Sequence, residues 1–130
     1  IVAIHGLGGH MYDTWTDKKT KVLWLRDFLP QSDELKNARI YTFGYDAKIV
    51  GSRSIATLRH IAQSLNSSLI HEENDKPLIF ICHSLGGIIA KIAITLSKNN
   101  REFQKLYHHI HGIMFFGTPH QGSDGANLGT

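Results

Sequence analysis

The sequence predicts an α/β fold in which a mainly parallel sheet carries helices on both faces. Short β-branched runs alternate along the chain with stretches that repeat apolar residues every three or four positions. One run, residues 78–82, is apolar throughout, which is typical of a parallel strand buried on both faces. The resulting β-α-β-α-β-α-β order implies right-handed crossovers between neighbouring strands.

The first half of the chain contains two expected strands and two expected helices. Residues 1–4 form an apolar strand, and residues 39–45 form a second one. Between them, residues 22–29 have the pattern of a short amphipathic helix, which Pro30 is expected to stop. Residues 54–71 predict a longer helix, and its buried face should carry Ile55, Leu58, Ile61, Ala62, Leu65 and Leu69.

In the second half, the apolar strand 78–82 leads directly into a helix that ends at Asn99-Asn100. Residues 110–116 then predict a fourth strand. We expect the buried face of the helix between these strands to be lined by Ile88, Ile89, Ile92, Ala93 and Leu96.

Ligands of parallel sheets bind beyond the carboxyl ends of the strands. The loops expected at that edge are residues 5–9, 82–87 and 117–122. The sequence therefore predicts that these three loops meet and form the functional site.

Composition excludes several classes of protein. With 130 residues, 42% hydrophobic and 19% charged, the chain allows one globular unit. The 14 Lys and Arg residues are scattered singly despite a net charge of +3, so we expect no nucleic-acid partner. The densest cluster, Lys18, Lys19 and Lys21, is interpreted as a solvated loop.

A single cysteine, Cys82, excludes an internal disulfide and argues against a thiolate zinc site, and no metal is expected.

The ends of the chain indicate a piece of a longer protein. Ile1 already lies inside an expected strand, and no initiator Met precedes it. We expect residues 1–130 to be a single partial domain, the N-terminal half of its fold, with later strands missing. No apolar run approaches the roughly 18 residues of a membrane span. The expected location is intracellular, either cytoplasmic or associated with an organelle membrane.

The strongest chemical motif is Cys82-His83-Ser84-Leu85-Gly86, which lies between the buried strand and the helix after it. It matches the nucleophile elbow G-x-S-x-G, except that Cys82 stands where the first glycine is usual, and its Cβ and sulfur are expected to narrow the turn. Such a turn projects the serine hydroxyl above the sheet. Ser84 is therefore the candidate nucleophile.

Acyl transfer also needs backbone donors for the developing oxyanion. The N–H of Leu85, at the start of the helix, is one natural donor, because the first N–H groups of a helix have no partner within it. The second donor usually comes from the loop after an earlier strand, and there we select Leu7 within the glycine loop. His5 and His83 are interpreted as loop-ordering residues, and Trp15 and Tyr45 as packing groups around the cleft.

The triad of this architecture follows the order Ser, then Asp or Glu, then His. After Ser84 the only acids are Glu102 and Asp124, and no histidine follows Asp124. Glu102 is expected at the opposite edge of the sheet and cannot orient a base beside Ser84. The remaining candidates within the chain are His120 as base and Asp124 as acid, so the triad is incomplete here.

Three segments together resemble the lipase-like serine esterases, a group that includes the serine active site-containing protein family and, more distantly, the GPI inositol deacylases. The segments are His5-Gly6-Leu7-Gly8-Gly9 with Thr14-Trp15, His83-Ser84-Leu85-Gly86-Gly87, and Phe115-Phe116-Gly117-Thr118-Pro119-His120-Gln121-Gly122-Ser123. The resemblance implies an α/β-hydrolase fold, Ser84 as nucleophile, no cofactor, and an acid and a base supplied by later segments. It also implies that the domain can precede a nucleotide-binding signalling module and repeat arrays in a longer chain.

These observations predict a serine hydrolase domain that cleaves or transfers the acyl group of a lipid or other carboxylic ester. Peripheral association with a membrane fits such a substrate. The alternative from another class is a non-catalytic domain of the same fold that senses a ligand or binds a partner within a larger signalling protein. A dinucleotide-binding domain is excluded, because no G-x-G-x-x-G follows the first strand and the only nearby acid, Asp46, sits in a loop.

Overall fold

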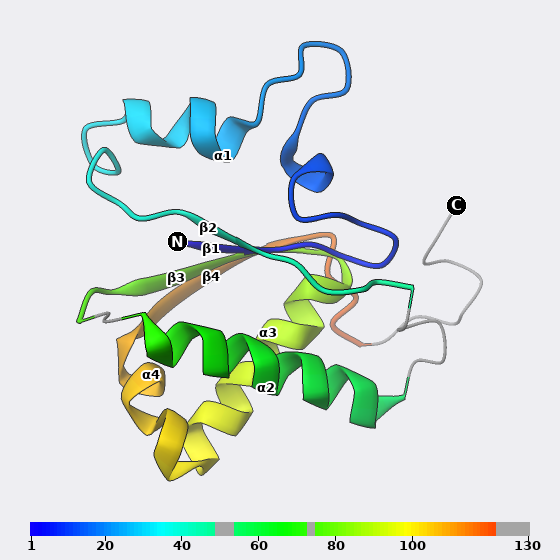
Figure 1. The fold of residues 1–130 in the computed structure, drawn as a ribbon, viewed down its shortest axis with the longest axis vertical. Coiled ribbons are helices and arrows are strands. Elements are labelled where there is room, and N and C mark those ends of the chain that lie inside the picture. Colours follow the sequence, from blue (N-terminus) through cyan, green and yellow to red (C-terminus); the bar gives the residue numbers. More distant parts are fainter. Residues whose placement is uncertain (49–53, 73–74, 122–130) are drawn as a thin grey trace.

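A computed structural model of the chain describes residues 1–48, 54–72 and 75–121. Its sheet contains β1 (Val2–Ile4), β2 (Tyr41–Phe43), β3 (Leu78–His83) and β4 (Ile110–Phe116), in the order β2-β1-β3-β4. All three neighbouring pairs are parallel (Figure 1). The predicted α/β class is confirmed, and the apolar strand β3 is central.

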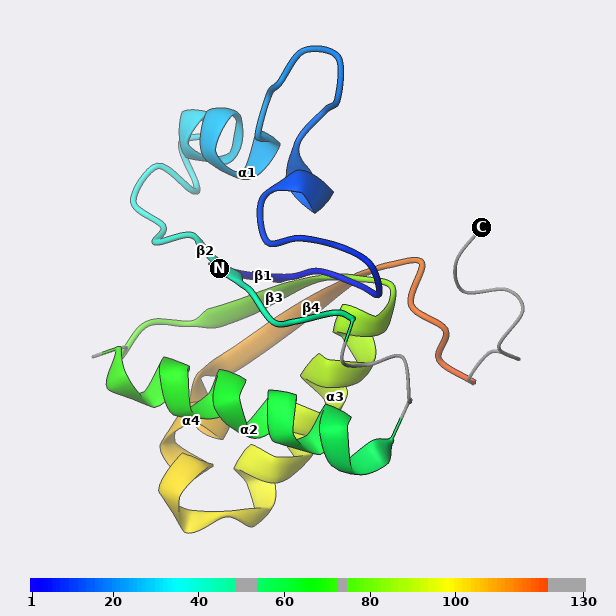
Figure 2. The same ribbon diagram turned by 45° about the vertical axis from the view of Figure 1, so that its right-hand side comes forward.

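Helices cover both faces of this sheet, as predicted. The short α1 (Trp24–Asp27) lies on one face, while α2 (Ile55–His71), α3 (Leu85–Asn99) and α4 (Gln104–His109) lie on the other (Figure 2). Two apolar clusters result from the alternation of side chains along the strands. Ala3 and Ile81 pack towards Trp15 and Leu25 on the α1 face, and the larger cluster on the α2 and α3 face contains Val2, Ile4, Phe80 and Cys82.

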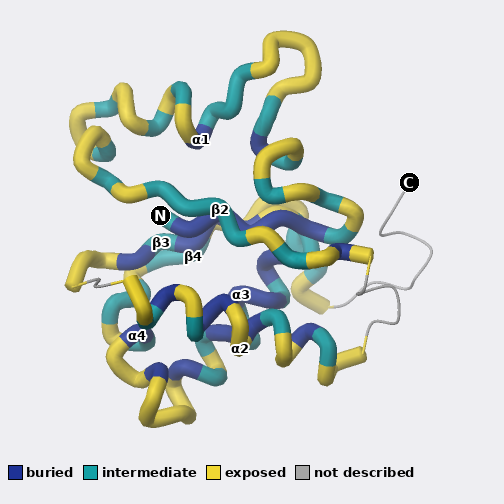
Figure 3. The backbone as a smooth tube through the Cα atoms, viewed as in Figure 1, coloured by how far each residue is buried: buried dark blue, intermediate teal, exposed yellow. Residues whose placement is uncertain are grey.

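Burial is concentrated in β1, β3 and the sheet-facing side of α3 (Figure 3). Beginning with Gly86, the buried positions of α3 recur at Ala90, Ala93 and Ser97, so this helix presents mainly small residues to the sheet. Of the expected lining, Ile89 and Ala93 are fully buried, and Ile88, Ile92 and Leu96 are half-buried and pack against the same core cluster. The close approach of Gly86 to β1 sets the rotation of the helix.

Three other expectations need correction. The predicted helix 22–29 is helical only at Trp24–Asp27, and Pro30 does not stop it but lies in the first turn of a 3₁₀ helix, Leu29–Gln31, where its missing N–H costs nothing. The predicted strand 39–45 pairs only at Tyr41–Phe43. Ile55 is 77% exposed, because it is the first residue of α2 and the buried series begins one turn later at Leu58.

The region between α3 and β4 contains two elements that the sequence pattern did not indicate, a 3₁₀ helix at Arg101–Phe103 and then α4. They bury Phe103 and Leu106.

Within the described ranges β4 pairs on one side only, and Met114, Phe115 and Phe116 are exposed on it. None of the described helices is long and apolar enough to cross a membrane.

Candidate active site

Ser84 occupies a sharp turn between β3 and α3. Its backbone has φ 50° and ψ −121°, a left-handed value of φ that a residue with a side chain rarely adopts. Such a conformation costs on the order of 1–3 kcal/mol and persists only where the surroundings hold it in place. The strand, strained turn and helix appear in the order that the motif predicted.

Glycines let the β1 loop approach this turn. A Cβ atom on Gly86 would lie 2.7 Å from the carbonyl oxygen of His5, and it would also collide with the carbonyl of Ile4. A Cβ atom on Gly6 would lie 2.7 Å from the Cβ of Ser84. Since real Cβ atoms cannot approach so closely, both positions need glycine for the loop after β1 to pack on Ser84.

The loop after β4 holds Ser84 from the other side. The N–H of Ser84 donates to the carbonyl oxygen of Phe116 at 2.8 Å, and the Thr118 hydroxyl donates to the carbonyl oxygen of Ser84 at 3.0 Å. The Thr118 side chain also fills the space above Gly87, where a Cβ atom would collide with it. The loops after β1, β3 and β4 therefore meet at Ser84, as the sequence predicted.

Cys82, which stands where the first glycine of the motif is usual, packs into the core. It belongs to β3, is completely buried, and packs in the cluster on the α2 and α3 face. Burial raises the pKa of its thiol to about 12, which keeps the sulfur neutral. Its side chain fills core volume, and this explains how the position tolerates a residue larger than glycine.

His5 is 1% exposed and orders the loop after β1. Its Nε2 accepts a hydrogen bond from the Tyr45 N–H at 3.4 Å, so the ring proton resides on Nδ1, which donates to the carbonyl oxygen of Gly6 at 3.0 Å. Burial lowers the pKa of His5, and this keeps the ring neutral. The interpretation of His5 as a loop-ordering residue fits these contacts.

His83 and Trp15 lie on the α1 side of the turn. His83 is exposed, and its ring meets the buried ring of Trp15 edge-on at 6.5 Å between centroids. Trp15 in turn packs edge-on against Trp24 at 6.1 Å. The interpretation of Trp15 as a packing group beside the cleft agrees with its 4% exposure.

The two predicted oxyanion donors lie on loops that meet at the turn. Leu85 is the first residue of α3, and the first backbone N–H groups of a helix have no hydrogen-bond partner within it. Leu7 is half-buried in the loop after β1. Their role as donors stays a prediction.

The candidate base and acid are not assembled with Ser84 in the part of the chain that the structure describes. His120 is exposed, its Nδ1 lies 3.4 Å from the Lys91 Nζ, and its ring rests edge-on against Phe115 at 4.6 Å. No hydrogen bond joins His120 to Ser84 among the described residues. Asp124 lies outside the described residues. Likewise, no cluster of metal-binding side chains occurs in residues 1–48, 54–72 and 75–121.

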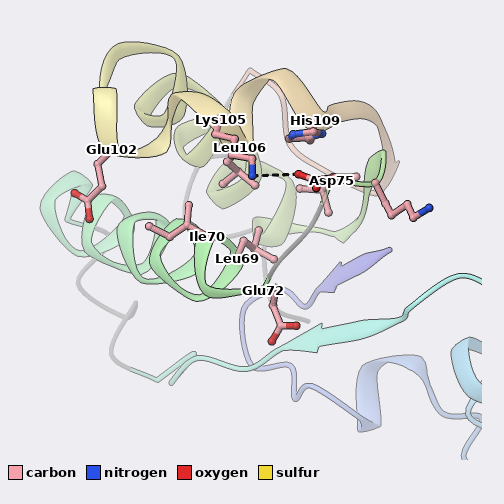
Figure 4. A pocket seen from close by; sticks show the side chains of 10 residues that line it. Leu69, Ile70, Glu72, Asp75, Glu102, Lys105, Leu106 and His109 are labelled. Carbon is pink, nitrogen blue, oxygen red and sulfur yellow. Dashed lines mark ion pairs between the residues drawn. The ribbon is translucent and has the colours of Figure 1, made fainter.

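A cavity of about 510 Å³ lies at the opposite end of the sheet, between α2 and α4 (Figure 4). Glu102 lines it, which agrees with the expectation that this acid is remote from Ser84. The cavity also contains the ion pair of Lys105 and Asp75, whose charged atoms lie 3.1 Å apart. Because the cavity contains none of the three loops that meet at Ser84, we place the candidate active site at Ser84.

Two contributors escaped the sequence reasoning. Thr118 belongs to a motif in the sequence, but the motif does not indicate its hydrogen bond to the Ser84 carbonyl. Tyr45 was expected to pack near the cleft, yet its hydroxyl also donates to the carbonyl oxygen of His5 at 2.8 Å. The available signal was a polar aromatic residue two positions after a strand, β2, that pairs with the strand leading into the glycine loop.

A strained serine between a central parallel strand and a helix is typical of α/β hydrolases. The chain belongs to the family described as "Putative serine esterase (DUF676)", which matches residues 1–129 and supports a hydrolase-type function. It is similar to "Protein SERAC1" of Mus musculus (23% identity, 95% of this chain and 22% of that protein) and of Homo sapiens (21% identity, with the same coverage). The chain thus spans about a fifth of the length of these curated relatives. No solved structure matches it.

Proposed function

We propose that the chain is a serine hydrolase domain in which the Ser84 Oγ attacks the carbonyl carbon of a carboxylic ester. The bond from that carbon to the alcohol oxygen breaks, the alcohol leaves with a proton, and the acyl group stays on Ser84. Water or another alcohol then releases the acyl group. The observation that carries this proposal is the strained backbone of Ser84 at the junction of β3 and α3.

The surroundings of Ser84 suit the negative charge that develops in this step. The N-terminus of α3 favours an anion, and the N–H groups of Leu85 and Leu7 are the proposed oxyanion donors. Loss of one such donor typically costs about 3 kcal/mol of barrier, or a hundredfold in rate. The base is assigned to His120 or to a histidine from a segment outside the 130 residues, with Asp124 or a later acid to orient it.

The proposed substrate is a lipid or another ester with an apolar acyl group. Phe115 and Phe116 support this choice, since they are 38% and 44% exposed and the carbonyl of Phe116 holds the N–H of Ser84. Exposed aromatic side chains beside a nucleophile favour an apolar ligand and contact with a membrane surface.

We further propose that the domain works within a longer chain, where signalling and repeat domains can adjoin it.

Reaction with an alkyl fluorophosphonate, which modifies only activated serines, tests the nucleophile. The protein in its full natural length should label, and Ser84→Ala should abolish the label. Ser68→Ala is the matched control, because Ser68 is exposed on α2 and bonds only within its own helix, to the Ser64 carbonyl. A folded protein that does not label would refute the proposal and favour the non-catalytic sensing or interaction domain.

The base can be tested with the same reagent. If His120 activates Ser84, His120→Gln should slow labelling by at least about a hundredfold. His111→Gln is the matched control, because His111 is exposed on β4 and bonds locally to the His109 carbonyl. Equal labelling of both variants would assign the base to another histidine.

A further inference from the structure

Tyr45, in the segment after β2, contacts His5 in three ways. The two rings stack at 4.2 Å between centroids with an angle of 4° between their planes. The Tyr45 hydroxyl donates to the His5 carbonyl oxygen at 2.8 Å, and the Tyr45 N–H donates to His5 Nε2 at 3.4 Å. Burial raises the pKa of the Tyr45 phenol, so the hydroxyl keeps the proton that it donates.

The backbone N–H of Tyr45 fixes which nitrogen of His5 carries the proton, while the Tyr45 ring and hydroxyl hold the imidazole and the carbonyl of His5 in place. A neutral imidazole has one donor and one acceptor nitrogen, and Nε2 is committed as the acceptor for Tyr45. The Nδ1–H then donates to the carbonyl oxygen of Gly6, which also accepts the N–H of Gly9 at 3.1 Å. The Gly6 carbonyl is thus held by two donors.

The peptide bond after Gly6 transmits this constraint to Leu7. Because a trans peptide is planar, its carbonyl and its N–H point in opposite directions. A Gly6 carbonyl held towards His5 and Gly9 turns the N–H of Leu7 the other way. Leu7 is the residue that the proposed function assigns as the second oxyanion donor.

We propose that Tyr45 is a positioning residue for the oxyanion hole, acting through His5 to set the direction of the Leu7 N–H. This inference rests on the proposed function. Tyr45 touches neither the nucleophile nor the acyl group in this role. Its contribution is to preorganise a donor before charge develops, which is how an oxyanion hole lowers a barrier.

The side chains of His10 and His83 affect the pKa of His5. Burial lowers the pKa of His5 most, the hydrogen bond to the Gly6 carbonyl raises it, and His10 and His83 lower it further through charge repulsion. They disfavour the doubly protonated ring, whose Nε2 could no longer accept the N–H of Tyr45. Burial and these two neighbours therefore favour the neutral form of His5, which can accept the N–H of Tyr45.

The test compares Tyr45→Phe with Tyr41→Phe in the protein of full natural length. Tyr45→Phe keeps the backbone N–H and the stacked ring and loses only the hydroxyl that holds the His5 carbonyl. Tyr41→Phe also loses one phenol hydroxyl, but that hydroxyl bonds to Glu72 at 2.9 Å, away from the three loops that meet at Ser84. With an alkyl fluorophosphonate, Tyr45→Phe should lower the maximal labelling rate of Ser84 about tenfold and leave the half-saturating concentration unchanged. Tyr41→Phe should label like the wild type, and both should be compared well below their melting temperatures.

The outcomes separate this inference from the proposed function. Wild-type protein that does not label overturns both. Wild-type protein that labels at Ser84, together with Tyr45→Phe labelling at the same rate, overturns only the positioning role. A rise in the half-saturating concentration at an unchanged maximal rate also overturns it, because Tyr45 would then affect reagent binding.

A second measurement does not depend on any variant folding. Nitrogen-15 spectra of labelled histidine distinguish the two neutral tautomers of His5. At neutral pH the proton should reside on Nδ1. A proton on Nε2 would overturn the inference, since Nε2 could not then accept the Tyr45 N–H and the Gly6 carbonyl would lose its Nδ1 donor.

Discussion

The hydroxyl of Thr118 donates a 3.0 Å hydrogen bond to the backbone carbonyl of Ser84. On the other side of Ser84, its N–H donates to the Phe116 carbonyl at 2.8 Å. Both peptide groups of the strained serine are thus held by the segment that ends β4. A strained conformation needs such external support, because it would otherwise relax to an ordinary value of φ. The Gly-Thr-Pro segment therefore supports the reactive turn from a separate strand.

Removal of the Thr118 hydroxyl should loosen this turn. Thr118→Val keeps the shape of the side chain but loses the hydrogen bond, so we expect the free energy of unfolding to fall by about 1 kcal/mol. Fluorophosphonate labelling of Ser84 should slow as well. Thr118→Ser retains the hydroxyl and should label close to the wild-type rate. Equal labelling of Thr118→Val and wild type would show that the other contacts of Ser84 suffice.

Gly86 should be intolerant of any side chain. The Cβ atom of Gly86→Ala would meet backbone carbonyls of β1 and its loop, which cannot move without disturbing the central sheet. Overpacking of this kind costs about 1–3 kcal/mol or more, and we expect a loss near the upper end. Gly112→Ala is the matched control, since nothing lies within 4 Å of a Cβ atom there. Denaturant unfolding of both variants measures the difference, and equal stability would contradict the proposed packing.

The order of the main elements was predictable because each carries a strong local signal. The apolar run of β3, the three-and-four spacing of α2 and the isoleucines and phenylalanines of β4 indicate their type without tertiary information. For the short α1 the presence of a helix was predictable but its bounds were not, and α4 was not predicted. With four and six residues, the extent of these helices depends on packing against neighbouring elements.

The candidate site was predictable as far as motifs place residues on loops. Ser84 and the glycine loop could be located because the carboxyl ends of parallel strands share one edge of the sheet. The contacts of Thr118 and Tyr45 could not be located, since they depend on side-chain directions across segments far apart in the sequence. The orientation of Cys82 into the core also depended on the register of β3, which the motif alone leaves open.

Cys82 should be unreactive in the folded protein. Its thiol is completely buried and burial raises its pKa to about 12, so almost no thiolate exists at pH 8. We expect a thiol reagent such as 5,5′-dithiobis(2-nitrobenzoic acid) to react with Cys82 only after denaturation. Rapid reaction of the native protein would place the sulfur in the turn instead of the core.

The exposed edge of β4 should make the isolated 130-residue chain self-associate. Met114, Phe115 and Phe116 are exposed on a strand that pairs on one side only in the described part of the chain. Strand edges without charge are prone to pair with other chains. Met114→Lys should raise the soluble, monomeric fraction in light scattering, whereas Lys98→Met, at an exposed position on α3, should not. A wild-type chain that stays monomeric in light scattering would contradict this expectation.

The buried ring of His5 should make stability depend on pH. Because burial lowers its pKa below the ordinary value of 6.5, the unfolded chain binds a proton more readily than the folded chain in mildly acid solution. The contribution of His5 is therefore complete above about pH 6.5 and is lost as the pH falls towards its folded pKa. Denaturant unfolding between pH 5 and pH 7.5 should show stability rising with pH, by at most about 1.4 kcal/mol per pH unit for one proton.

His5→Gln tests this assignment, because glutamine cannot bind a proton in that range. The variant should be less stable than the wild type at neutral pH, yet its stability should change less between pH 5 and pH 7.5. His60→Gln, at an exposed position on α2, serves as the matched control and should keep the wild-type dependence. If His5→Gln retained the full pH dependence, another group would be responsible, and the neutral, hydrogen-bonded His5 would not be the source of the acid sensitivity.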